Sequence, residues 1–223
     1  MHLAQQFSPG TGLSKEKNVK RLFLSSSFAD VVSLLKQFDE DNCEGKTVTF
    51  IATASIPEKV KFYVGAGKKA LEKNGFVVDE LEISQATAED ISQKLRHNDY
   101  IYVSGGNTFF LLQELKRTGA DKIIVEQINA GKLYIGESAG SMILSPNIEY
   151  AKEMDDYKIA TGLDSYDALH VVEFYPVPHY TNSPFKKAVE KIISKYEAKI
   201  TLNPISNSQA ILVKADTVVI VNK

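Results

Sequence analysis

The chain has 223 residues, enough for one sizeable hydrophobic core, and its 43% hydrophobic and 24% charged residues are ordinary for a soluble globular protein. Its net charge of -2 does not favour nucleic-acid binding, which normally needs a basic face. No apolar run approaches the roughly 18–20 residues of a membrane span. The single Cys43 excludes an intramolecular disulfide and a Cys-rich zinc site. These features predict a cytoplasmic protein that binds neither membranes nor nucleic acids.

The first residues differ in character from the rest. Residues 1–19 lack the apolar segment of a signal peptide and predict a poorly ordered leader. Residues 20–223 carry no repeat, low-complexity tract or linker, which predicts a single α/β domain.

Up to residue 136, apolar β-branched runs alternate with helical patterns. A helix-like spacing follows Val60, and a helix should end at Asn74-Gly75. Thr87 should cap the next helix, whose first turn carries acidic residues. Strand-like runs occupy 21–26, 47–54, 76–83, 100–103 and 133–136, and helix-like runs 30–38, 60–71, 88–97, 110–115 and 121–129.

The last third changes character. Residues 146–180 are rich in Pro, Tyr and Asp and predict an irregular loop region, apart from a short strand at 169–172. A helix over 184–196 and strands over 199–202 and 210–221 follow. The alternation of strands and helices predicts βαβ units, and therefore a mostly parallel sheet covered by helices on both faces.

Gly136-Glu137-Ser138-Ala139-Gly140 is a G-x-S-x-G pattern between a predicted strand and a predicted helix. In this context the small residues allow a sharp turn that projects Ser138 as a nucleophile. The alternative is a tight turn with a purely structural purpose.

A serine nucleophile needs a base, usually histidine, and a group that orients it. His179 stands in a loop stiffened by two prolines, which makes it the favoured base. His2 lies in the leader, His97 ends a polar helix, and His170 falls on the predicted strand at 169–172. From the residues alone, the carboxylate that would orient the histidine is not decided. The candidates between Ser138 and His179 are Glu149, Glu153, Asp155, Asp156, Asp164, Asp167 and Glu173.

Acyl transfer also needs hydrogen-bond donors for the developing oxyanion. Residues 104–108 (Ser-Gly-Gly-Asn-Thr) end a predicted strand and begin a helix, so backbone N–H groups are accessible there. The amide of Ala139 is the natural second donor. The alternative is a plain βα turn or a phosphate cradle, but the stretch lacks G-x-G-x-x-G and G-K-[ST].

Three stretches in this order resemble the peptidase E family of serine peptidases: Gly-Gly-Asn-Thr-Phe, then Gly-x-Ser-Ala-Gly, then Pro-His-Tyr-Thr-Asn. The resemblance covers roughly residues 20–215. It implies a flavodoxin-like three-layer α/β sandwich and a Ser-His-Asp triad, with Ser138 as nucleophile and His179 as base. It further implies oxyanion donors at Gly106 and Ala139.

In the family, the triad aspartate lies in an Asn-Asp-Met-Pro-Ile stretch. The nearest match in this chain is residues 155–159, which implies Asp156 as the first candidate for the triad carboxylate and Asp155 as the second. The family α-aspartyl dipeptidase has a bulky aromatic residue where this chain has Glu137. If Glu137 lies along the cleft rim, its carboxylate should favour a substrate's free amino terminus and disfavour an aspartyl side chain; the alternative is a buried Glu137 without effect on specificity. Asn107 is a second candidate specificity residue.

The sequence thus predicts a serine exopeptidase acting on dipeptides or short peptides, with Asp-X among the candidate substrates. No cofactor is expected, and no His/Cys/Asp cluster has metal-ligand spacing. An α/β-hydrolase esterase and a non-catalytic binding module are the alternatives, and the oligomeric state, monomer or dimer, stays open.

Overall fold

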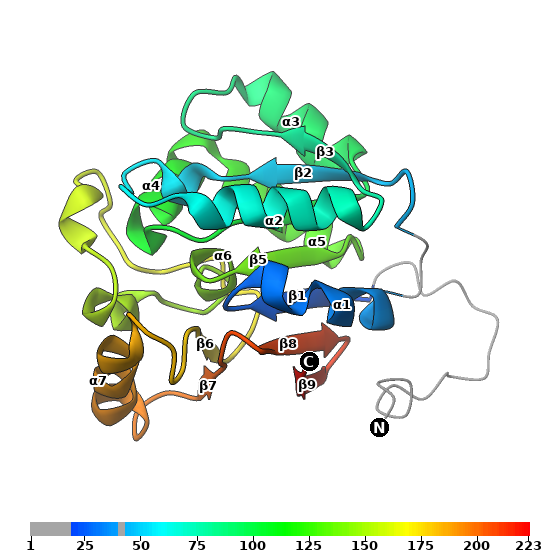
Figure 1. The fold of residues 1–223 in the computed structure, drawn as a ribbon. Coiled ribbons are helices and arrows are strands. Elements are labelled where there is room, and N and C mark those ends of the chain that lie inside the picture. The colour runs from blue at the N-terminus through cyan, green and yellow to red at the C-terminus, as the bar shows by residue number, and fades with distance from the viewer. Residues whose placement is uncertain (1–18, 40–42) are drawn as a thin grey trace.

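The computed structural model describes residues 19–39 and 43–223, so the predicted leader falls, apart from Val19, outside the described residues (Figure 1). Its central feature is a seven-stranded sheet in the order β3-β2-β4-β5-β1-β8-β9. The first five strands in this order are parallel, and β8 and β9 add an antiparallel hairpin beside β1. The strands are β1 (Arg21–Ser25), β2 (Thr47–Ile51), β3 (Val77–Glu80), β4 (Tyr100–Val103), β5 (Tyr134–Glu137), β8 (Gln209–Lys214) and β9 (Thr217–Asn222).

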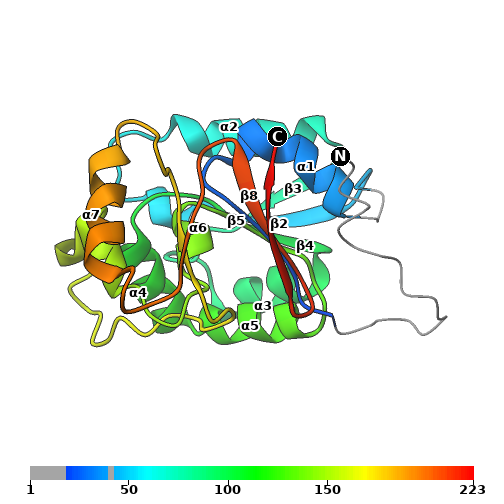
Figure 2. The same cartoon turned by 90° about the horizontal axis from the view of Figure 1, so that it is seen from below.

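Helices cover the sheet on both faces, as the alternation of elements predicts. Figure 2 shows α1 and α2 on one side of the sheet and α3 and α5 on the other. A separate pair of short parallel strands, β6 (Tyr175–Val177) and β7 (Leu202–Pro204), lies beside α7. The helices are α1 (Phe28–Phe38), α2 (Phe62–Lys73), α3 (Ala88–His97), α4 (Thr108–Thr118), α5 (Ala120–Asn129), α6 (Ala139–Met142) and α7 (Lys186–Tyr196).

The core forms two layers, one on each face of the sheet. Along β1, Leu22 and Leu24 point into the layer that contains α3, α4 and α5, whereas Phe23 points into the layer under α1 and α2. All three side chains are fully buried. Central strands buried on both faces have no polar side, which explains why their sequences read as continuous apolar runs. The observed architecture is the mostly parallel, three-layer α/β sandwich expected from the sequence.

Some predicted elements differ from the structure. The run at 210–221 is a hairpin, because the chain reverses at Ala215 in the left-handed region (φ 53°). The predicted strand at 169–172 is irregular backbone, and α2 begins at Phe62 rather than at Val60, which is 60% exposed.

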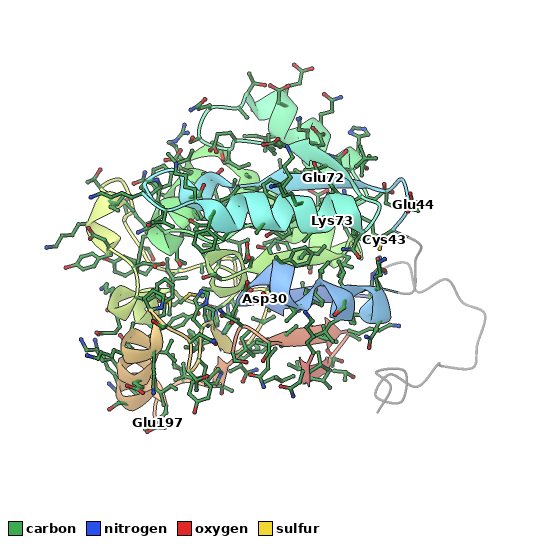
Figure 3. All side chains as sticks on the ribbon, in the orientation of Figure 1. Asp30, Cys43, Glu44, Glu72, Lys73 and Glu197 are labelled. Atoms are coloured by element: carbon green, nitrogen blue, oxygen red, sulfur yellow. The ribbon has the colours of Figure 1, made fainter. Side chains whose placement is uncertain are left out.

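The carboxyl ends of the parallel strands define one edge of the sheet. The register pairs Gly136 of β5 with Leu24 of β1 and with Val103 of β4, so these three strands end side by side. Ligand sites of open α/β sheets lie at this edge. Cys43 precedes β2 and therefore lies at the opposite edge, where it is buried (Figure 3). This agrees with a structural cysteine rather than a reactive thiol.

No helix among residues 19–39 and 43–223 is long and apolar enough to cross a membrane.

Candidate active site

Ser138 occupies the sharp turn between β5 and α6. Its backbone is held at φ 49° and ψ -108°, a conformation that non-glycine residues rarely adopt. The Ser138 amide donates to Ser25 O at 2.8 Å, and α6 starts at the next residue. A Cβ on Gly140 would lie 2.1 Å from Val103 O, so only glycine lets α6 approach β4 this closely. The predicted strand–turn–helix setting of the G-x-S-x-G pattern is therefore present.

His179 faces this serine. Ser138 Oγ lies 2.9 Å from His179 Nε2, across 41 positions of sequence. Ser138 and His179 are each partly exposed, so a substrate can reach the pair. The distance is that of a nucleophile and its general base.

The loop that carries His179 is fixed at several points. The His179 backbone is in the left-handed region (φ 64°), and its amide donates to Ser26 Oγ at 2.9 Å. The Ser26 hydroxyl in turn donates to Ile205 O at 2.9 Å. The His179 ring stacks on Phe185, with ring centroids 4.7 Å apart. These contacts hold the imidazole toward Ser138.

The other ring nitrogen contacts an amide rather than a carboxylate. His179 Nδ1 lies 2.9 Å from Asn207 Oδ1. Because an amide oxygen can only accept, Nδ1 carries the proton, and Nε2 is left to accept from Ser138. The sequence reasoning missed Asn207 because it searched only carboxylates between Ser138 and His179. A polar Ile-Ser-Asn-Ser turn between two strand-like runs was the available signal.

The prediction that Asp156 orients His179 is therefore corrected. Asp156 is exposed, and its carboxylate accepts from Lys158 N at 3.0 Å at the start of the short 3₁₀ helix η4 (Tyr157–Ile159). Asp155, the second choice, is turned toward α4. Its Oδ2 accepts from Thr108 N at 2.9 Å and from Thr108 Oγ1 at 2.5 Å. Burial raises the pKa of Asp155 to about 6, although these two donors lower it in part.

Of the two predicted oxyanion donors, Ala139 directly follows Ser138 and Gly106 lies in the turn between β4 and α4. A Cβ on Gly105 would lie 3.2 Å from Ser138 Cβ, so the β4–α4 turn lies against the nucleophile. Gly106 has φ 134°, and a Cβ there would lie 2.2 Å from Ala54 O, so no other residue fits. Within the described residues, neither the Gly106 nor the Ala139 N–H donates a hydrogen bond. The Ala139 N–H directly follows the nucleophile, and the Gly106 N–H belongs to the turn that lies against it.

The two candidate specificity residues have structural roles instead. Glu137 is only 3% exposed, so the expectation of a rim carboxylate is wrong and the buried alternative holds. Its Oε1 accepts from Phe28 N at 2.9 Å and its Oε2 from Tyr102 Oη at 2.7 Å. Burial raises the pKa of the Glu137 carboxyl, although the hydrogen bonds from Tyr102 and Phe28 lower it in part.

Asn107, 1% exposed, caps α4 by accepting from Phe110 N at 2.9 Å. Its Nδ2 donates to Asp156 O at 3.0 Å. Both Asn107 contacts are therefore made within the protein.

Burial lowers the pKa of His179 below its usual value, and the hydrogen bond with Asn207 offsets only part of this effect. The imidazole is therefore neutral at neutral pH, as a general base must be.

Tyr63 forms part of the wall next to the β4–α4 turn. Its Cε2 lies 3.7 Å from the point that a Cβ on Gly105 would occupy. The Tyr63 hydroxyl is buried and has no hydrogen-bond partner among the described residues. Burial and the neighbouring Glu58 carboxylate raise its pKa, so the hydroxyl stays protonated.

The remaining histidines do not join the site. His170 is exposed and its Nε2 lies 3.1 Å from Glu173 Oε2, His97 contacts Gln93 O, and His2 lies outside the described residues. Within residues 19–39 and 43–223, no group of three or more His, Cys, Asp or Glu side chains could hold a metal ion.

A mostly parallel α/β sheet that presents a strained serine and a histidine at its carboxyl edge defines the class of α/β proteins with a nucleophile elbow. The sequence profile of peptidase family S51 matches residues 22–221. The chain belongs to peptidase family S51.

Individual relatives agree with this family. The chain is 58% identical over 201 residues to an uncharacterized peptidase of Listeria monocytogenes, covering 90% of this chain and 98% of the relative. It is 37% identical over 114 residues to peptidase E of Shewanella denitrificans, which is 51% of this chain and 47% of that protein. A crystal structure of a putative peptidase E protein from Listeria monocytogenes superposes with a TM-score of 0.88 at 56% identity, covering 92% of this chain and 99% of that one.

Proposed function

We propose that this chain is a serine-type peptidase that hydrolyses dipeptides or short peptides. The observation that carries the proposal is the 2.9 Å contact between Ser138 Oγ and His179 Nε2 at a strained turn. A turn with a purely structural purpose would require neither a positive φ at Ser138 nor a histidine within hydrogen-bond distance of its hydroxyl. Family membership supports peptide bonds as the target.

In the proposed reaction Ser138 Oγ attacks the scissile carbonyl carbon while His179 Nε2 takes the hydroxyl proton. The carbonyl oxygen becomes an oxyanion that accepts from the Gly106 and Ala139 amides. His179 then returns the proton to the leaving amine as the C–N bond breaks, which leaves an acyl-Ser138. Water then attacks the ester while His179 Nε2 takes its proton, and His179 gives this proton to Ser138 Oγ as the acyl–oxygen bond breaks, which releases the acid and restores the serine.

The buried position of Glu137 changes the expected specificity. A carboxylate at the cleft rim would disfavour aspartyl substrates, but the Glu137 carboxylate is buried and accepts hydrogen bonds from Phe28 N and Tyr102 Oη. Asp-X dipeptides therefore stay among the proposed substrates. The Tyr63 hydroxyl, which lacks a partner within the described residues, is the group we propose to pair with a polar atom of the bound peptide.

An esterase of the α/β-hydrolase kind has no observation in its favour here. A non-catalytic module that keeps the elbow as architecture does not account for the Ser138–His179 contact. A reducing, cytoplasmic setting is part of the proposal, because a chain with a single cysteine cannot form an intramolecular disulfide.

A fluorophosphonate serine probe, followed by a dipeptide panel, tests the proposal. We expect the wild type to label at Ser138 and to cleave some members of a panel of Asp-X, Glu-X and neutral X-X dipeptides. Ser138→Ala should fold normally and lose turnover by on the order of 10⁶-fold. Ser194→Ala, which removes an exposed hydroxyl on α7, is the matched control and should behave as wild type. A folded wild type that neither labels nor cleaves any dipeptide would overturn the proposal.

A further inference from the structure

We propose that Asn207 is the positioning residue of this site: its neutral side-chain amide, in place of a carboxylate, holds His179 in the tautomer that accepts the Ser138 proton. The inference rests on the proposed function of Ser138 and His179. It departs from the Ser-His-Asp arrangement that the family resemblance implied.

The first support is that the loop that carries His179 also holds Asn207 in place. Asn207 N donates to Asn182 Oδ1 at 2.9 Å, and Asn182 N donates to His179 O at 2.9 Å. With the contact between Asn207 Oδ1 and His179 Nδ1, the three residues form a closed ring of hydrogen bonds. An asparagine that lay near the imidazole by chance would not be held by hydrogen bonds at both its backbone and its side chain.

The second support is the lack of a competing charge. Among the described residues, the groups that hydrogen-bond to or stack on the His179 ring are the Ser138 hydroxyl, the Asn207 amide and the Phe185 ring, and none of them ionises near neutral pH. The Ser26 hydroxyl binds the His179 backbone. Within the described residues, no charged side chain contributes to the pKa of His179, which is set by burial and by Asn207.

An amide and a carboxylate at this position have different consequences. Both fix the tautomer, but only a carboxylate favours the charged imidazolium. With Asn207 the imidazole stays neutral, and so able to act as a base, down to a pH below the usual range for histidine. Replacing the amide by a carboxylate should raise the pKa of His179 by about one to three units, as an opposite charge within hydrogen-bond distance does. The acid limb of the activity profile should then move to higher pH.

The rate of Ser138 labelling by a fluorophosphonate probe, measured from pH 4 to pH 9, tests this without knowledge of the substrate. For Asn207→Asp we expect the acid limb to move up by about one unit or more. For Asn207→Ala we expect a rate at least about tenfold lower across the range, because the Nδ1–H loses its acceptor. Asn129→Asp makes the same amide-to-carboxylate change at the exposed end of α5 and should leave the profile unmoved.

A second measurement covers the case in which these variants do not fold. Nitrogen-15 NMR of the wild type reports which nitrogen of each histidine carries the proton, and we expect Nδ1–H for His179 at pH 7. A His179 with its proton on Nε2, an unmoved limb in folded Asn207→Asp, or a wild-type rate in Asn207→Ala would each overturn the role of Asn207. If the wild type itself fails to label, the proposed function of Ser138 fails instead, so the two failures are distinguishable.

Discussion

Replacing Glu137 by alanine should destabilise the fold more than almost any other single change near the site. The Glu137 carboxylate accepts from the Phe28 amide at 2.9 Å and from the Tyr102 hydroxyl at 2.7 Å. These donors belong to the start of α1 and to the middle of β4. One side chain therefore ties two elements to the residue before the nucleophile.

The size of the effect follows from the donors left without an acceptor. A buried donor that loses its partner costs about 1–3 kcal/mol. Two such donors, with some relaxation of the surroundings, give an expected loss of about 2–5 kcal/mol in the free energy of unfolding for Glu137→Ala. Glu137→Gln should lose only about 1 kcal/mol, because its amide oxygen can accept from the Phe28 N–H and its NH₂ can donate to a reoriented Tyr102 hydroxyl.

Urea unfolding at pH 7 measures both values. Glu126→Ala removes an exposed carboxylate that pairs with Arg96 on the surface and should cost at most about 1 kcal/mol. If Glu137→Ala lost no more stability than Glu126→Ala, the hydrogen bonds to Glu137 would not stabilise the fold as expected. If Glu137→Gln and Glu137→Ala were equally unstable, the loss of stability would not come from hydrogen bonding.

Four further substitutions separate the roles assigned above. His179→Ala should reduce probe labelling of Ser138 nearly as much as the loss of the serine itself. His170→Ala, at an exposed position, should leave labelling unchanged. If His170→Ala lost more labelling than His179→Ala, the general base would be His170. Gly106→Ala should lower both the unfolding midpoint and the labelling rate, because its Cβ would lie 2.2 Å from Ala54 O, and wild-type values for both would contradict the assigned geometry. Because the folded pKa of Asp155 is raised to about 6, the stability it contributes is present below its unfolded value near 4 and falls as pH rises through 6. Asp155→Asn should flatten this pH dependence in urea unfolding between pH 4 and pH 7, and an unchanged slope would show that Asp155 does not cause it.

The sequence predicted the parts of the site that depend on local pattern. A G-x-S-x-G turn is defined by small residues within five positions, so strand, elbow and helix could be read directly. The Gly-Gly stretch at 105–106 and the proline-flanked His179 are equally local features. The central strands were recognisable because each is an apolar run bounded by turns.

The residues that were mispredicted depend on tertiary packing. Nothing in the sequence around Glu137 says that the Phe28 amide and the Tyr102 hydroxyl converge on it, because they lie 109 and 35 positions away. The prediction of Asp156 depends on the alignment of a loop. A shift of a few residues in such an alignment changes which side chain is expected to face the His179 imidazole. Asn207 follows His179 by 28 positions, and the pairing of β6 with β7 helps to bring its loop back to the ring.

The Ser26 hydroxyl joins two distant parts of the chain, since it accepts from His179 N and donates to Ile205 O, 153 and 179 positions further on. During synthesis on the ribosome, the segment that holds Ser138 emerges well before His179, Ile205 and Asn207. The serine, its base and the base's partner can meet only after the chain beyond residue 207 has left the exit tunnel and β8 has paired with β1. A partly made chain would thus carry the elbow without a working base, so the proposed hydrolytic activity is withheld until the chain has been synthesised beyond β8.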